Sequence, residues 1–274
     1  MNSINTNLGA MVALQNLNKI TADLRVTQTR ISTGLKVGSA KDDGAIYAIA
    51  QSQRAEIKAL DSVKMSLSRT SSTVDVAMMA GESIQDMLSD LKEKALAASD
   101  TSLDTTSRDA LKADFTAIRN QITKTIANAT FNGINLLNGS RANVGAIANA
   151  QGTSHLTVDA EDMSLGGGII TLGASTDFST ATSAQALLST LDDSIGNMSS
   201  ALARLGTSSK SLDRHATFIG KLQDTMDGAV GKLVDADMAK EATKLQALQI
   251  KQQLAIQALS IANQSQSYML SLFR

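Results

Sequence analysis

The residues that could serve as nucleophiles, bases or metal ligands are few. The chain has only two histidines, His155 and His215, without the HExxH spacing of a zinc site, and it has no cysteine. Ser89 and Lys92 match the Ser-x-x-Lys of some acylases, but no Lys-Thr-Gly accompanies them. We interpret all of these as ordinary polar side chains, and we expect no catalytic residue, no bound metal and no cofactor.

Two glycine motifs could bind phosphate but lack the required neighbours. A phosphate loop needs Gly five positions before the Gly231-Lys232 pair and Ser or Thr after it, whereas Met226 and Leu233 stand there. Gly166-Gly167-Gly168 lacks the strand-to-helix setting of a dinucleotide site. The sequence therefore gives no support for an enzyme.

Composition narrows the remaining classes of protein. Among 274 residues, 25 Lys plus Arg balance 26 Asp plus Glu, so the net charge of −1 does not favour nucleic acid or an anionic membrane. No apolar run of about 18 residues occurs, so we expect no membrane insertion. The start of the chain also lacks the basic and apolar regions of a secretory signal. Because the chain has no proline, helices can run long.

The C-terminal segment has two apolar stripes. Steps of three and four run from Leu245 to Phe273, a heptad pattern that drives helix pairing, and Gln252 to Phe273 carries no charge. The second stripe lies on a different face and consists of Ile250, Leu254, Ile261, Tyr268 and Leu272. One partner helix cannot cover both stripes.

The N-terminal segment repeats this pattern over a predicted helix at residues 4–32, and residues 1–18 are uncharged. Ordering each residue costs about 1–2 kcal/mol of backbone entropy, more than one helix pair returns by burial. We therefore expect both ends to be marginal in a monomer and to become ordered against neighbouring copies. The candidate assembly residues are Ile4, Leu8, Leu17, Ile20 and Leu24 at one end, and Leu245, Leu248, Leu259, Met269 and Phe273 at the other.

The middle of the chain predicts more helix around a small β region. Apolar spacing predicts an antiparallel helical hairpin from helices over 45–98 and 106–129, and a long return helix over 183–226 that ends near Gly228–Gly231. Between them, residues 131–175 are rich in glycine, with hairpin turns predicted at Asn132-Gly133 and Asn138-Gly139 and short strands at 156–158 and 169–172. The predicted fold is mainly α: a long antiparallel helical bundle or coiled coil with paired N- and C-terminal helices, plus a small β-hairpin region.

Several motifs resemble bacterial flagellin. At the N-terminal end they are Ile4-Asn-Thr-Asn7, Ile31-Ser-Thr-Gly-Leu35, Ser39-Ala-Lys-Asp-Asp43 and Phe131-Asn-Gly-Ile-Asn-Leu-Leu137. At the C-terminal end they are Asp237-Met-Ala-Lys-Glu-Ala-Thr-Lys-Leu245 and Ala262-Asn-Gln-Ser265. The resemblance covers about residues 1–140 and 183–274, so we expect a short form without large outer variable domains.

This resemblance implies a structural subunit that polymerises into the flagellar filament for swimming motility. It implies a core domain of residues 1–43 and 232–274, in which the terminal helices pair, and a spoke domain of residues 44–231. It further implies export through the flagellar type III apparatus to the extracellular filament. The implied partners are other copies of the chain, an export chaperone, the filament cap and the hook–filament junction proteins.

One helical segment departs from the family. Recognition of flagellin by a vertebrate Toll-like receptor depends on a stretch resembling Leu-Gln-Arg-Val-Arg-Glu-Leu, which aligns here with Leu88 to Lys94. Asp90 and Lys94 replace an arginine and a leucine, whereas Lys92 and Glu93 keep the charge of the family residues. Asp90 reverses one charge and Lys94 adds another, and because like charges at a contact surface weaken binding, we expect weak receptor activation.

Three alternatives remain open at this point. A hook–filament junction protein shares the terminal helices and would form a ring instead of a polymer. A signalling coiled coil would need a membrane anchor or charged helix ends, and an enzyme would need a larger middle and a metal motif. The long match at both ends of the chain favours flagellin.

Overall fold

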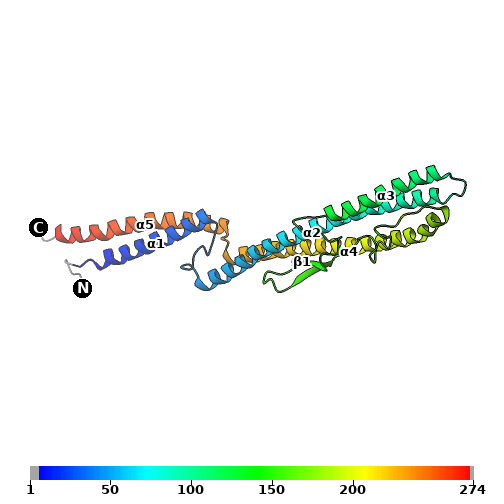
Figure 1. The fold of residues 1–274 in the computed structure, drawn as a ribbon. Helices are drawn as coiled ribbons and strands as arrows, with labels where there is room; N and C mark the ends of the chain where they lie inside the picture. The colour runs from blue at the N-terminus through cyan, green and yellow to red at the C-terminus, as the bar shows by residue number, and fades with distance from the viewer. Residues whose placement is uncertain (1–5, 272–274) are drawn as a thin grey trace. The chain divides into compact units, whose positions relative to one another are not determined.

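The chain folds into long helices and one small sheet. The computed structural model describes residues 6–271, and side chains for residues 6–264; Figure 1 shows the elements. In this range the elements are α1 (Leu8–Thr33), α2 (Gly44–Ala98), α3 (Thr105–Asn128), β1 (Asn143–Ile147), β2 (His155–Asp159), α4 (Ala181–Val234) and α5 (Met238–Ser271). The mainly α prediction is confirmed, as are the helices predicted over 45–98 and 106–129.

The chain divides into two compact units. The terminal unit contains Met1–Ala55 and Thr225–Arg274, and the central unit contains Glu56–Asp224. In the terminal unit, α1 and α5 lie side by side and antiparallel (blue and orange to red in Figure 1). The Asn7 side chain caps the start of α1, and Gly34, at φ 72°, ends it in the left-handed conformation that glycine adopts without strain.

The segments that follow α1 and precede α5 are also paired. Leu35 and Asp235 form an antiparallel bridge, and the Lys36 amide donates to the Val234 carbonyl at 2.6 Å. The Ala236 amide donates to the Gly34 carbonyl at 2.8 Å. The chain therefore closes the α1–α5 pair with backbone hydrogen bonds at one end.

In the central unit, α2 and α4 run antiparallel as a coiled coil. Gln223 Nε2 donates to the Ile57 carbonyl, and Gln85 Nε2 donates to Ser199 Oγ. Buried positions of α2 follow steps of three and four without a break: Leu60, Val63, Leu67, Thr70, Val74, Ala77, Gly81, Ile84, Leu88, Leu91 and Ala95. This is the heptad pattern that keeps a seam facing its partner over many turns.

Helix α3 folds back beside α2. Arg108 connects the two helices because its guanidinium donates to the carbonyls of Ala98, Asp100 and Leu103 at the turn. Further along, the buried ring of Phe115 meets Phe178 edge to face, with ring centroids 5.3 Å apart.

The small β region is present, but one of its two strands differs from the prediction. β1 and β2 form a two-stranded antiparallel sheet in which Val144 pairs with Val158. The strand predicted at 156–158 is confirmed within β2, and β1 was not predicted. The strand predicted at 169–172 is wrong, because there the Thr171 amide donates to Ser194 Oγ of α4 instead of to a neighbouring strand.

Of the two predicted Asn-Gly turns, the one at Asn132-Gly133 is confirmed, whereas at Asn138-Gly139 only the glycine has a positive φ, 68°, so no type I′ turn forms there. Asn132 and Gly133 both have positive φ, 50° and 74°, as a type I′ turn requires, and Phe131 and Ile134 exchange two backbone hydrogen bonds of 2.9 Å across it.

The end predicted for the return helix at Gly228–Gly231 is wrong. α4 continues through both glycines to Val234, because Val230 and Val234 are buried and no proline stops the helix.

Candidate functional site

The predicted assembly residues that the structure describes lie on the α1–α5 pair. Leu17, Ile20 and Leu24 on α1, and Leu245, Leu248 and Leu259 on α5, are buried or half-buried. Leu8 is different, with 73% of its surface exposed. Ile4 and Phe273 lie outside the described residues, and Met269 lies in α5 beyond the described side chains.

The contact between these helices has a heptad pattern on both sides. On α5 the covered positions are Leu245, Leu248, Gln252, Ala255, Leu259 and Ala262. On α1 they are Ala10, Ala13, Leu17, Ile20, Leu24, Thr27 and Ile31. We call these two sets the terminal seam. Small residues fill part of it, and for this reason Ala10, Ala13 and Thr27 gave no hydrophobic signal in the sequence.

Polar contacts connect α1 and its N-cap to α5 near both ends of the terminal seam. Asn7 Nδ2 donates to the Ala262 carbonyl at 2.8 Å, and Arg30 forms an ion pair with Glu241 at 3.2 Å. Glu241 is buried, so its charge depends on Arg30 for compensation. Buried polar pairs of this kind specify the register of paired helices. Sequence reasoning missed these residues, although Arg30 and Glu241 flank the heptad positions.

Large apolar side chains remain exposed on the same helix pair. Three members of the second stripe predicted on α5 are not covered by α1, since Ile250, Leu254 and Ile261 are 58%, 57% and 67% exposed. The other two, Tyr268 and Leu272, lie beyond the described side chains. Among the described side chains, the other large apolar ones exposed on α1 and α5 are Leu8, Met11, Val12, Leu14, Val26, Met238 and Ile256. One chain therefore does not cover the apolar surface of its own ends.

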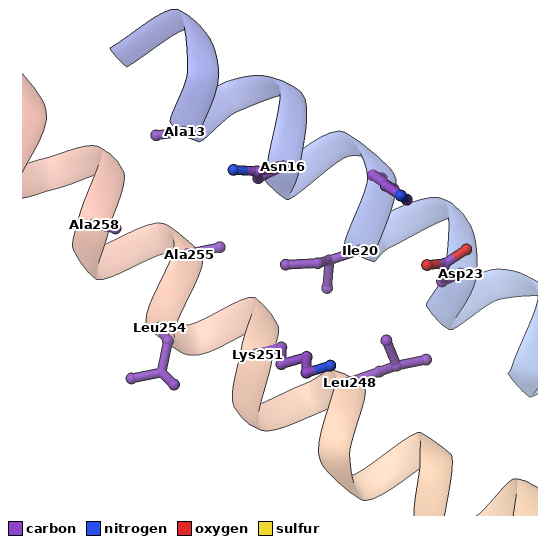
Figure 2. A pocket seen from close by; sticks show the side chains of 10 residues that line it. Ala13, Asn16, Ile20, Asp23, Leu248, Lys251, Leu254, Ala255 and Ala258 are labelled. Atoms are coloured by element: carbon purple, nitrogen blue, oxygen red, sulfur yellow. The ribbon is translucent and has the colours of Figure 1, made fainter. Parts of the chain in front are cut away.

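An open groove of about 590 Å³ lies between α1 and α5. Figure 2 shows Ala13, Asn16 and Ile20 on α1, and Leu254, Ala255 and Ala258 on α5, among the residues that line it. Lys19, Asp23, Leu248 and Lys251 complete the lining. Six of the ten lining residues are aliphatic, and the other four, Asn16, Lys19, Asp23 and Lys251, are polar or charged, so an apolar side chain can pack against the aliphatic part of the groove.

The segment that aligns with the receptor-contact stretch lies on α2 in the central unit. Asp90 and Glu93 are exposed. Lys92 forms an ion pair with Asp192 of α4, and Lys94 lies 3.9 Å from Asp114 of α3. The two acidic side chains are therefore presented to solvent, and the two lysines are held against neighbouring helices.

The residues that could do chemistry are dispersed. His155 is exposed on β2, while His215 Nε2 lies 2.8 Å from the Ala148 carbonyl. Ser89 Oγ donates to the Gln85 carbonyl within α2. Gly231 and Lys232 lie inside α4, and not at the start of a helix where phosphate would bind.

No group of three or more His, Cys, Asp or Glu side chains in the described part of the chain is arranged to hold a metal ion. None of the helices described is both long and apolar enough to cross a membrane.

Comparison with protein families yields two matches that together span most of the chain. A model of the bacterial flagellin N-terminal helical region matches residues 4–142, and a model of the bacterial flagellin C-terminal helical region matches residues 188–273. Flagellin FljM of Caulobacter vibrioides is 54% identical over 274 residues, covering 100% of this chain and 99% of the relative. A flagellin of Brucella melitensis is 36% identical over 283 residues, in an alignment that covers 100% of this chain and 100% of the relative.

Solved structures show the same fold at lower identity. The crystal structure of Bacillus cereus flagellin matches with a TM-score of 0.50 at 19% identity, over 56% of this chain and 88% of the other. A chain described as a putative flagellar hook-associated protein of Vibrio parahaemolyticus matches with a TM-score of 0.57 at 15% identity, over 71% of this chain and 100% of the other. At these identities the likeness concerns the fold alone.

Proposed function

The chain belongs to the bacterial flagellin family, and from that premise we propose that α1 and α5 carry the contacts by which its copies polymerise. The function itself is structural: the chain is a subunit of the flagellar filament that serves swimming motility. It is a short flagellin, since relatives of the same length match it from end to end.

The observation that carries the proposal is the uncovered apolar surface of the terminal helices. Exposed apolar patches mark interaction sites. Here the patches lie beside the terminal seam, which is already covered within one chain because α1 and α5 pack against each other. Side chains 1–18 and 252–273 carry no charge, so identical copies packed together do not bury like charges against one another. The assembly residues from the sequence act in this proposal as two groups. Those on the terminal seam hold α1 to α5, and Leu8 belongs to the surface offered to neighbours.

We assign the chain two functional parts. Residues 1–43 and 232–274 form the core domain, which makes the polymer contacts. Residues 44–231 form the spoke domain, stiffened by the α2–α4 coiled coil, by α3 and by the β-hairpin region. The α1–α5 pairing and the continuous heptad pattern of α2 support this division.

The other proposed partners are proteins of flagellar export and assembly. The filament lies outside the cell, so the subunit passes through the flagellar type III apparatus and is extracellular when it functions. An export chaperone covers the C-terminal region before export, and the cap and hook–filament junction proteins contact the ends of the filament. Exposed Ile250, Leu254 and Ile261 support this assignment, because such a surface needs protection before assembly.

A hook–filament junction protein is the less favoured alternative. The fold is compatible with both, but relatives of 54% identity over the full length are flagellins. A junction protein forms one ring, whereas a flagellin continues as a polymer.

Complementation tests the proposed function in a cell. A bacterium that lacks its own flagellins is given a gene for this chain, and swimming is scored together with sheared surface filaments. We expect restored swimming and filaments composed of a 28.7 kDa chain. Secretion of the chain without filaments, in a strain with an intact cap, would contradict the proposal.

A further inference from the structure

The α1–α5 pair has two unlike faces. Ala13 and Ala255 line the groove, and the next residue of each helix, Leu14 and Ile256, points about 100° further around its axis. The two helices face each other and run in opposite directions. A rotation of about 100° from the facing position therefore points the next side chain to the same side of the pair on both helices. Leu14 and Ile256 therefore share the face opposite the groove, where they are 48% and 53% exposed.

These two side chains also lie at the same height along the pair. Asn7 is level with Ala262, to which it is hydrogen bonded. Leu14, seven residues further along α1, is then level with Ala255 and Ile256 on the antiparallel α5. In the same register, Ala258 of the groove is level with Met11, about one turn from Leu14, and Ala13 is the residue before Leu14. Met11, exposed one turn before Leu14, extends this apolar ridge along α1. We define the ridge as Met11, Leu14 and Ile256.

We propose that the ridge of one copy docks into the α1–α5 groove of a second copy, in a heterologous contact that repeats from copy to copy. The inference rests on the proposed polymerisation and names the surfaces that perform it. Ridge and groove lie on opposite faces of the pair, so each docked copy presents a free ridge on one side and a free groove on the other. Heterologous contacts of this kind generate open polymers unless their rotation closes a ring.

The chemistry of the two surfaces agrees with a second copy as the occupant. Ala13, Ala255 and Ala258 leave space between the helices, and the branched or flexible side chains of the ridge have the size to fill it. The ridge lies in the stretches that carry no charge, so its burial requires no ion pair. Lys19, Asp23 and Lys251 lie on the groove, where they can remain in contact with water at its rim.

Disulfide trapping tests the contact directly, because the native chain has no cysteine. Leu14→Cys and Ala258→Cys proteins are mixed, polymerised on seeds of the unsubstituted protein and oxidised, and the linked peptides are identified by mass spectrometry. We expect a disulfide between residue 14 of one copy and residue 258 of another. We expect no 14–14 and no 258–258 disulfides. Met11→Cys provides a second probe of the ridge, and Val26→Cys, exposed on α1 away from both surfaces, is the matched control that forms no link to residue 258.

The outcomes separate this inference from the proposed function. Filaments that contain 14–14 links show a symmetric ridge-to-ridge contact and overturn the groove assignment. Filaments in which neither residue 11 nor residue 14 links to residue 258 overturn it as well, although the proposed polymerisation stands. If the unsubstituted protein forms no polymer on its own seeds, the proposed function fails and the inference fails with it.

Discussion

Replacing Leu259 by aspartate tests the role of the terminal seam. Leu259 is half-buried on α5 and level with Ala10 of α1, because Asn7 pairs with Ala262 three residues away on each helix. Full burial of a leucine contributes about 1.5–3 kcal/mol, so half-burial loses about 1 kcal/mol on substitution. Removing the new carboxylate from water adds at least about 2 kcal/mol. No cation compensates for this charge, since α1 carries none before Lys19.

The total of about 3 kcal/mol for each subunit corresponds to roughly a 100-fold weaker assembly constant, since 1.4 kcal/mol is a factor of ten. We expect Leu259→Asp to abolish filaments at concentrations where the unsubstituted protein polymerises. The assay is the critical concentration for seeded growth, measured by sedimentation. Thermal unfolding of the central unit should be unchanged, because α5 belongs to the terminal unit.

Leu259→Met is the matched control for this substitution. It keeps the volume and the apolar character of the side chain, and such exchanges cost less than about 1.5 kcal/mol. Its critical concentration should stay close to that of the unsubstituted protein. If Leu259→Asp polymerises at the unsubstituted critical concentration, the seam assignment is refuted.

Three further predictions concern the central unit. Phe115→Ala removes a fully buried ring and should destabilise the central unit by about 3–5 kcal/mol in thermal unfolding, while the helicity of the terminal unit persists. Hydrogen bonds from Ser107 lower the pKa of Asp104, the N-cap of α3, so the carboxylate stabilises the fold above the usual Asp pKa. This stability is lost as pH falls through the lowered value, so Asp104→Ala should destabilise the protein at neutral pH and much less in acid, as denaturant titration at both pH values will show. Purified monomer should activate a vertebrate Toll-like receptor reporter weakly, and Asp90→Arg with Lys94→Leu should increase the response; full potency of the unsubstituted chain would contradict this reading.

The helices could be predicted because their signals are local. Steps of three and four mark α2 from Leu60 to Ala95, and polar breaks such as Ser99 to Asp104 mark its connection to α3. Predictions based on glycine alone were less reliable. Gly228 and Gly231 did not end α4, because the burial of Val230 and Val234 outweighs the weak helix propensity of glycine.

The position of the β strands and the polar contacts between helices could not be predicted from the sequence, because both depend on residues that are far apart along the chain. Ile170 and Leu172 have strand propensity and are buried, but a hydroxyl on α4 bonds the Thr171 amide between them. Gly145 and Ala146 lack strand propensity, yet β1 includes them.

In the terminal helices, too, the local pattern could be predicted and the long-range contact could not. The stripe from Leu245 to Ala262 was visible as a heptad repeat. The ion pair of Arg30 with Glu241 joins residues at opposite ends of the chain, and no local pattern reveals such a pairing.

Electron microscopy of the full-length protein grown from its own seeds tests most directly whether this chain is a polymerising subunit. We expect long filaments that keep growing as monomer is added, because every bound copy presents a new surface for the next. Closed rings of fixed size, or a folded monomer that does not extend the seeds, would contradict it.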